Sequence, residues 1–269
     1  MSESPDRYSH GHHESVLRSH RWRTAHNSAG FLLSHLNRGD RVLDVGCGPG
    51  TITVDLAKLA SPGGVVGIDR SAEVIDAARS HTDGACLSNL EFRVGDVYDL
   101  DFEDGSFDVV FAHQVLQHLS DPVRALAQMR RVLAPGGLVA VRDADYGAFA
   151  WSPTNPGLER WMELYHEIAR RNRAEPDAGR VLAKWVRAAG FEDLEVTSSN
   201  WTFFQEDERL WWGRLWADRV RQSEFALQAV EYDLTTIDEL EGIAQAFLDW
   251  ASSDDGVFIV VNGEVLART

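Results

Sequence analysis

Three glycines at alternate positions, Gly46, Gly48 and Gly50, follow an apolar segment that predicts a buried strand. Glycine lets the backbone turn sharply and approach a ligand with no Cβ in the way. The helix-compatible segment that follows would direct its free N–H groups at the same place. The spacing is not the dinucleotide-binding G-x-G-x-x-G, because the third glycine comes one residue early. Asp44, two residues before the first glycine, would repel a pyrophosphate but could receive a cationic or polar ligand.

Two further carboxylates follow the next apolar segments. Asp69 comes about 20 residues after the glycine turn, where an acidic residue of a doubly wound sheet accepts hydrogen bonds from ribose hydroxyls. Asp96 follows the third apolar segment and could accept a hydrogen bond from an adenine amino group. Val74 and Val97 could offer apolar contacts to the same ring. The alternatives are a solvent-exposed aspartate at a strand end and an aspartate that begins a turn.

Polar side chains also follow the fourth and fifth apolar segments. His113 could act as a general base, hold the ligand or brace a loop, with Gln114 beside it. His118 is interpreted as a structural histidine. Asp143 and Tyr146 are candidates on the substrate side, and the alternative for both is an ordinary polar loop.

Alternating strands and helices would hold these side chains in place. Apolar segments typical of strands recur at residues 42–45, 65–69, 90–94, 107–112, 138–141, 195–204 and 257–261. Helical patterns separate the first five, which predicts a parallel, doubly wound α/β sheet. Ligands of such sheets bind beyond the carboxyl ends of the strands. A helix is expected over residues 25–36, and a turn at Asn262-Gly263 after the last strand.

Three motifs in this order resemble the class I S-adenosylmethionine-dependent methyltransferases, in particular the ubiquinone and menaquinone biosynthesis C-methyltransferases. They are Asp44-x-Gly46-x-Gly48-x-Gly50, Gly95-Asp96-Val97 and Leu133-Ala134-Pro135-Gly136-Gly137, and the resemblance covers residues 40–142. It implies a doubly wound, seven-stranded, mostly parallel Rossmann-like sheet. An N-terminal helical cap and a helical insertion before an antiparallel last strand complete this expected fold.

The resemblance also implies S-adenosyl-L-methionine as the cofactor. The residues expected to contact it are Tyr8, Arg21, Asp44, Gly46, Cys47, Gly48, Asp69, Arg70, Val74, Asp96, Val97 and His113. Segments before the first strand often fold over the cofactor in such enzymes, and a simple packing helix is the alternative. The catalytic candidates are His113, Asp143 and Tyr146. Aligning the nucleophile with the methyl group and excluding water can supply much of the rate of methyl transfer, so that a base is not required.

The chain is expected to form one methyltransferase domain over residues 1–269, with three parts. Residues 1–38 would be the cap, 39–142 the cofactor-binding core and 143–269 the substrate-side elaboration. Its helical insertion, residues 205–255, would lie over the carboxyl edge of the sheet as a substrate lid. Three tryptophans of the insertion, Trp211, Trp212 and Trp216, are interpreted as core rather than as a ligand cage. The aromatic and apolar residues near the site favour a small apolar or aromatic metabolite.

The composition of the chain limits the kinds of partner and compartment that we expect for it. The formal charge of −16 argues against nucleic acid, because neutralising phosphates needs a basic surface. No apolar run approaches the roughly 20 residues of a membrane-spanning helix. Two cysteines do not make a disulfide framework and indicate a reducing, cytoplasmic compartment. A homodimer is compatible with the sequence, which does not fix the oligomeric state.

A histidine-rich run, with His10, His12 and His13, invites a metal interpretation. No matching cluster follows at ligand spacing, so no metal is expected. Two other functions stay open. One is a nicotinamide-dependent oxidoreductase on a similar sheet, which the glycine spacing and Asp44 disfavour. The other is a non-catalytic module that binds S-adenosylmethionine.

Overall fold

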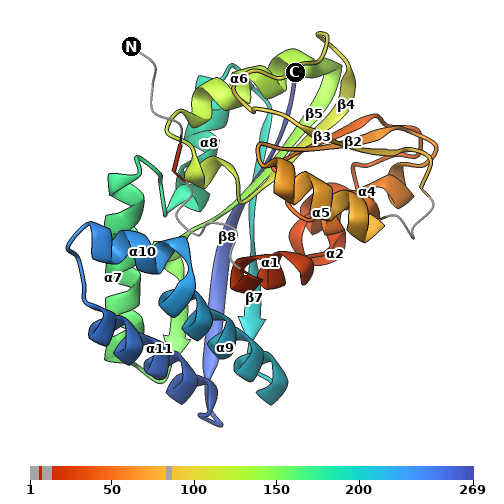
Figure 1. The fold of residues 1–269 in the computed structure, drawn as a ribbon. Coiled ribbons are helices and arrows are strands. Elements are labelled where there is room, and N and C mark those ends of the chain that lie inside the picture. Colours follow the sequence, from red (N-terminus) through yellow and green to blue (C-terminus); the bar gives the residue numbers. More distant parts are fainter. Residues whose placement is uncertain (1–5, 8–13, 83–86) are drawn as a thin grey trace.

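A computed structural model of the chain describes residues 6, 7, 14–82 and 87–269. Its described strands form one eight-stranded sheet, in the order β3-β2-β1-β4-β5-β8-β6, with β7 paired to β8 as well (Figure 1). The strands are β1 (Val42–Val45), β2 (Val65–Asp69), β3 (Leu90–Val94), β4 (Phe107–His113), β5 (Leu133–Ala144), β6 (Ala150–Ser152), β7 (Leu194–Phe203) and β8 (Val257–Arg268). Strands β1 to β5 are parallel, and β8 is antiparallel to β5, β6 and β7. The predicted doubly wound, mostly parallel sheet with an antiparallel last strand is confirmed.

Two strand predictions need correction. The structure has eight strands rather than seven, because the three-residue β6 adds to one edge of β8. The turn expected at Asn262-Gly263 is wrong, since β8 runs straight through both residues and pairs them with β5 and β7. Glycine is required at position 263 because the backbone of another segment packs closely against it. A Cβ on it would lie 2.1 Å from the carbonyl oxygen of Gly179.

Helices cover both faces of the sheet. On one face α2 (Ala25–Ser28), α3 (Gly30–Leu33) and α4 (Thr51–Ala60) pack against β1, β2, β4 and β5. On the other face α6 (Pro122–Val132) and α8 (Ala178–Ala188) pack against the same strands and β8. Asp121 caps α6 by accepting the Arg124 N–H, and Pro122 opens it. The single helix predicted over residues 25–36 is wrong, because it breaks into α2 and α3 at Ala29.

A second hydrophobic core lies at one end of the β7–β8 pair. It gathers α7 (Pro156–Arg171), α9 (Glu206–Gln222), α10 (Glu224–Glu231) and α11 (Ile237–Ala251) around the last residues of β7 and the first residues of β8 (Figure 1). The predicted helical insertion before the last strand is therefore confirmed. Trp212 and Trp216 are buried in this core, as predicted, and Trp211 packs against it. None of the helices in the described residues has both the length and the apolar character that a membrane crossing requires.

Helix α1 (Glu14–Arg21) joins the insertion to the sheet. The Arg18 guanidinium pairs with Asp218 of α9 at 2.6 Å, and Arg219 Nη2 donates to Ser19 Oγ at 2.9 Å. At the other side, Thr51 Oγ1 at the start of α4 donates to the carbonyl of His20 at 3.2 Å. Helix α1 thus lies between α4 and helix α9 of the insertion.

Candidate functional site

The glycine turn between β1 and α4 is built as the alternate spacing predicts. Gly46, Gly48 and Gly50 all have left-handed backbones, with φ of +70°, +55° and +79°. A Cβ on Gly46 would lie 2.4 Å from Val115 Cγ2, so packing as well as conformation requires glycine there. A Cβ on Gly48 would meet no atom closer than His20 Nδ1 at 3.6 Å. Gly48 thus keeps open a space that a ligand can approach.

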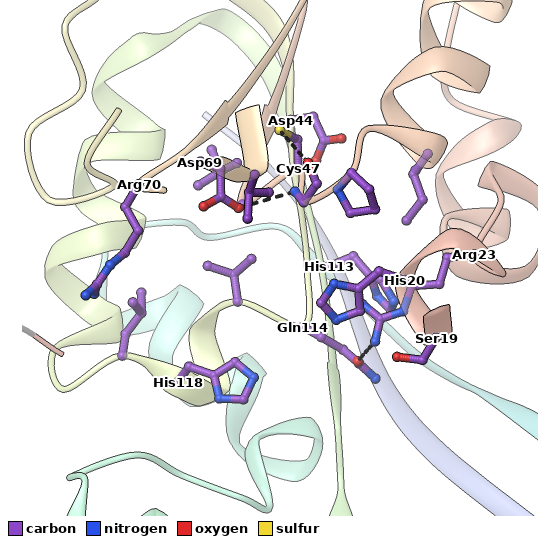
Figure 2. Close-up of a pocket in the computed structure, with 18 of the residues that line it drawn as sticks. Ser19, His20, Arg23, Asp44, Cys47, Asp69, Arg70, His113, Gln114 and His118 are labelled. Atoms are coloured by element: carbon purple, nitrogen blue, oxygen red, sulfur yellow. Dashed lines mark hydrogen bonds between the residues drawn. The ribbon is translucent and has the colours of Figure 1, made fainter. Parts of the chain in front are cut away.

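A cavity of about 640 Å³ begins at this turn. Figure 2 shows Asp69 and Arg70 on one side of it and Ser19, His20 and Arg23 on the other. The far wall carries the aromatic side chains Tyr146, Phe149, Trp201, Trp211, Trp212 and Trp216. The cavity therefore connects the carboxyl ends of β1 to β4 with the second core.

The predicted carboxylates line the first part of the cavity. Asp69, at the end of β2, accepts the Gly48 N–H at 3.3 Å and the Ser71 N–H at 3.0 Å. Asp96, after β3, is exposed and accepts the Tyr98 N–H at 2.9 Å. Val74 and Val97 are buried beside them. This is the arrangement of acceptors and apolar surface that a ribose and a purine ring would need.

Asp44 lies deeper in the same cavity. Its side chain is buried, and Thr53 Oγ1 donates to it at 2.6 Å. Burial raises the pKa of this carboxyl to about 7, although the Thr53 hydrogen bond lowers it. A cationic group placed here would favour the carboxylate form. Burial also raises the pKa of the Cys47 thiol, so Cys47 is an inert lining group rather than a nucleophile.

His113, the last residue of β4, is in the middle of the site (Figure 2). Its Nδ1 lies 3.4 Å from Arg142 Nη1, and its ring meets the Trp201 ring edge-on at 5.7 Å. Burial lowers the pKa of His113 well below the ordinary value, and Arg23, Arg142 and His20 lower it further. The main chain of Arg142 offsets only part of this. These surroundings argue against a general base, because a proton gained here would lie beside several cationic groups.

The guanidinium next to His113 belongs to a buried network. Arg142 pairs with Glu264 at 3.1 Å, and Ser199 Oγ accepts from it at 3.1 Å. The same guanidinium lies 4.7 Å from the centre of the Trp201 ring. Desolvation lowers the pKa of Arg142 to about 10, with Glu264 opposing the change, so it stays a cation at neutral pH. The network fixes both His113 and Trp201.

The other two catalytic candidates have different positions. Tyr146 lines the cavity, but its ring stacks on Tyr165 at 3.8 Å and on Phe149 at 4.5 Å. Asp143 does not line the cavity, which is a correction to its predicted place on the substrate side. Alternate residues of a strand face opposite sides of a sheet, so Asp143 points away from the side of Arg142. It accepts the Gln117 N–H at 3.1 Å instead, with Oδ1 as the acceptor.

Some of the remaining residues expected to contact the cofactor line the cavity, and others do not. Arg70 lines the cavity, as do Gly46, Cys47 and Gly48. Arg21 is exposed and does not line it, because the next turn of chain brings Arg23 there instead. Tyr8 and the three clustered histidines lie outside the described residues. Within the described part of the chain, no group of three or more His, Cys, Asp or Glu could hold a metal ion.

Two lining arginines, Arg23 and Arg219, had no signal strong enough to find them from the sequence. Arg23 reaches across to Gln114, where Nη2 donates to Oε1 at 2.5 Å, and its guanidinium lies 5.5 Å from the Trp201 ring centre. Arg219 enters from α9 and lies 4.5 Å from the Trp216 ring centre. His118 also lines the cavity and hydrogen-bonds Gln117 at 3.0 Å, with its pKa lowered by burial to about 3. Only the position of Gln114 and His118 after the fourth strand pointed to this site.

Comparisons with known proteins agree with this geometry. The family described as "Methyltransferase domain" matches residues 36–206. A protein of Schizosaccharomyces pombe described as an uncharacterised methyltransferase is 33% identical over 285 residues, which cover 100% of this chain and 99% of the relative. Demethylmenaquinone methyltransferase of Staphylococcus aureus is 32% identical over 176 residues, 65% of this chain and 67% of the relative.

Among solved structures, phosphoethanolamine N-methyltransferase 2 of Haemonchus contortus, in complex with S-adenosyl-L-methionine, has a TM-score of 0.52. The match has 19% identity and covers 87% of this chain and 49% of that one. At this identity the likeness shows the shared fold.

Proposed function

Because the chain belongs to the class I S-adenosylmethionine-dependent methyltransferases, we propose that its cavity holds the cofactor at the glycine turn and a small apolar or aromatic metabolite at the tryptophan wall. The cofactor of the family is S-adenosyl-L-methionine. The family assignment decides against the nicotinamide-dependent alternative and makes the protein an enzyme. The observation that carries the proposal is that one cavity joins Gly48 and Asp69 to Trp201 and Trp216.

The residues that would hold the cofactor fit its parts. Asp69 presents a carboxylate that already orients the glycine turn and would accept the ribose hydroxyls. Asp96 would accept the adenine amino group, between the apolar surfaces of Val74 and Val97. Asp44 offers a buried carboxyl whose charged form a cationic amino group would stabilise. The open space over Gly48 leaves room for the part of the cofactor that joins its amino group to its ribose.

When bound, the cofactor supplies an electrophilic methyl group on a sulfonium. The chain's own contribution is then position and exclusion of water. Helices α1 and α9 both line the cavity and are held together by the hydrogen bond from Arg219 to Ser19. We propose closure of the cavity as the role of the insertion, which the sequence predicted as a lid. Packed aromatic side chains would limit the directions from which the acceptor can approach.

The substrate end favours a flat, largely apolar molecule. The aromatic side chains of the far wall line it, and the relative from Staphylococcus aureus is named demethylmenaquinone methyltransferase. A net charge of −16 disfavours a nucleic-acid substrate. The two cysteines, with Cys47 free and buried, suit a reducing cytoplasmic compartment.

The experiment that tests the proposal uses S-adenosyl-L-methionine labelled in its methyl group and a panel of hydroxylated quinols, phenols and aromatic acids. We expect transfer of label to at least one aromatic member and binding of S-adenosylhomocysteine by calorimetry. NADH should give no heat of binding in the same cell. Transfer only to a protein or nucleic acid would contradict the proposed substrate class.

A further inference from the structure

We propose that Gln114 is a positioning residue for the methyl acceptor, because it holds Arg23 at the border between the cofactor end of the cavity and the tryptophan wall. The inference rests on the proposed function and assigns a further residue to the same site. Gln114 and Arg23 both line the cavity. Three features carry the inference: the backbone conformation of Gln114, the orientation of its amide group and the side of the cavity on which its partners lie.

The backbone of Gln114 has a conformation that residues with a Cβ disfavour. Its φ of +54° lies in the left-handed region, which only two other non-glycine residues of the described chain share, Arg173 and Asp233. Glycine would adopt this conformation without strain. The conformation turns the chain from the end of β4 into the short 3-10 helix η1 (Leu116–His118), while the Gln114 N–H still donates to the Arg142 carbonyl at 2.7 Å. A glutamine at a position suited to glycine indicates that its side chain is needed.

The amide group of Gln114 is held at both of its ends. Arg23 Nη2 donates to Gln114 Oε1 at 2.5 Å (Figure 2). A guanidinium has only donors, so the oxygen of the amide must face Arg23. Gln114 Nε2 donates to Asn262 Oδ1 at 3.2 Å. Asn262 Nδ2 in turn donates to the Val260 carbonyl at 3.3 Å, which leaves the asparagine oxygen for Gln114. Arg23, Gln114 and Asn262 thus form a chain of contacts, here called the tether.

The tether explains why an asparagine interrupts an apolar strand. Asparagine is depleted in strands, and the sequence suggested a turn at this position. Strand β8 nevertheless continues through Asn262 and pairs it with Ala144 and Ser199. Asn262 is fully buried, and a buried amide needs hydrogen-bond partners, one of which is Gln114. The tether therefore runs from the segment after α1 to the interior of the sheet.

The partners of Gln114 lie on the substrate side of the cavity. The next residue, Val115, packs against the glycine turn, since a Cβ on Gly46 would lie 2.4 Å from Val115 Cγ2. Gln114 instead contacts Arg23, whose guanidinium lies 5.5 Å from the centre of the Trp201 ring. Trp201 belongs to the tryptophan wall, where we place the acceptor. Loss of the tether should therefore disturb acceptor binding and leave cofactor binding intact.

The segment that carries Arg23 contacts Trp201 in two further ways. Trp201 Nε1 donates to the Asn27 carbonyl at 2.7 Å, and the Trp22 ring meets the Trp201 ring edge-on at 5.3 Å. By holding Arg23, Gln114 thus helps to fix this whole segment against the wall. A fixed wall binds a rigid acceptor more tightly than a mobile one, because less conformational freedom is lost on binding.

The first test asks whether Gln114 holds the segment, and it needs no ligand. Hydrogen exchange of the amides of residues 23–28 is measured by mass spectrometry in the native protein and in Gln114→Gly. We expect faster exchange in the variant, because the segment opens more often without the tether. Asp233→Gly is the matched control, since Asp233 has φ of +55° but is exposed and lies outside the cavity. Unchanged exchange in Gln114→Gly, or the same increase in Asp233→Gly, would overturn the proposal.

The second test separates the side chain of Gln114 from its backbone strain. The probe is 2-naphthol, titrated by calorimetry into protein saturated with S-adenosylhomocysteine. We expect Gln114→Gly and Gln114→Ala to weaken 2-naphthol binding equally, by about tenfold, since both lose the bond to a charged group. Gln114→Gly should unfold at a higher urea concentration than Gln114→Ala, because only alanine is strained at this φ. Gln114→Glu keeps an oxygen within reach of Arg23 and should retain most of the native affinity.

Three results of the second test would contradict the inference. If the native protein does not bind 2-naphthol, or if every variant binds it as tightly as the native protein, Gln114 positions no aromatic acceptor. If Gln114→Gly binds 2-naphthol more tightly than Gln114→Ala, affinity follows stability and the role is only structural. If S-adenosylhomocysteine loses affinity as much as 2-naphthol does, Gln114 acts on the cofactor.

Failure of the proposed function has a different signature. In that case S-adenosylhomocysteine binds neither the native protein nor the variants, and no label is transferred to any acceptor. The hydrogen-exchange comparison does not depend on either ligand, so it still decides whether Gln114 holds the segment that carries Arg23.

Discussion

The main-chain N–H of Gly48 donates to the Asp69 carboxylate at 3.3 Å, and this bond ties the turn after β1 to the end of β2. The second oxygen of the same carboxylate accepts from the Ser71 N–H, just before α5 (Ala72–Thr82). One side chain therefore sets the position of two backbone segments that both face the cavity. We propose that its remaining lone pairs accept the ribose hydroxyls.

Asp69→Asn should weaken S-adenosylmethionine binding by about tenfold or more, because one charged acceptor is replaced by a donor. Asp76→Asn, on the exposed face of α5, removes a carboxylate that only pairs with Arg79 and should leave the affinity unchanged. Calorimetry of both variants measures the difference. An Asp69→Asn protein with normal affinity would mean that the ribose is bound elsewhere.

Gly48→Ala should reduce both stability and cofactor binding. Its φ of +55° strains any residue with a Cβ by about 1–2 kcal/mol, and the added carbon would face the cavity. Gly39→Ala is a matched control, since Gly39 has φ of +97° with open space around it and lies outside the cavity. We expect both variants to lose stability in urea unfolding, and only Gly48→Ala to lose affinity. Equal affinity in the two variants would contradict the placement of the cofactor over the turn.

Glu264→Gln should lower the free energy of unfolding by about 3 kcal/mol, because it leaves the buried Arg142 cation without its counter-charge. The pair Arg160–Glu239 is 36% and 40% exposed, so Glu239→Gln should change stability by less than about 1 kcal/mol. Chemical unfolding of the two variants gives the comparison. Similar values for both would show that solvent reaches the Arg142 network.

Asp143→Asn should stabilise the protein, and more at high pH than at low pH. Burial raises the pKa of Asp143 to about 8 in the folded state, from an ordinary value near 4. Between these values the unfolded chain releases its proton while the folded chain keeps it. Stability is therefore fully present below about pH 4, is lost as the pH rises towards 8, and levels off above.

The variant removes this loss, which is at most about 6 kcal/mol at 1.36 kcal/mol for each pKa unit. Thermal melts of the native protein and of Asp143→Asn at pH 5 and pH 9 measure it, with the larger gap expected at pH 9. Asp44, with its pKa raised to about 7, acts in the same direction in both proteins and cancels in the difference. Cofactor affinity should not change, because Asp143 lies outside the cavity.

The sequence predicted the sheet well because its signals are local. Glycines 46, 48 and 50 need left-handed backbones, and the apolar segments on either side have lengths typical of buried strands. The errors occurred where a local pattern had a long-range cause. Asn262-Gly263 has the composition of a turn, yet Gly263 is required because Gly179 of a distant helix packs against it.

The cofactor side of the site could be predicted, and the substrate side only in part. Asp44 lies in β1, Asp69 ends β2 and Asp96 follows β3, so strand positions alone bring them together. Arg219 and Trp201 reach the cavity only through the packing of α9 and β7, which no spacing in the sequence encodes. Asp143 shows the opposite limit, since β5 continues to Ala144 and holds Asp143 on the other face of the sheet from Arg142, where it accepts the Gln117 N–H.

Strand β8 belongs to both hydrophobic cores, with Phe258 and Val260 in one and Val265 and Ala267 in the other. Trp201 on β7 and the glycine turn after β1 are thus connected through a continuous ladder of main-chain hydrogen bonds across the sheet. The distance between them is therefore set by the sheet. In the site that we propose, a fixed separation would favour flat acceptors over broad, three-dimensional ones that carry the same reactive atom.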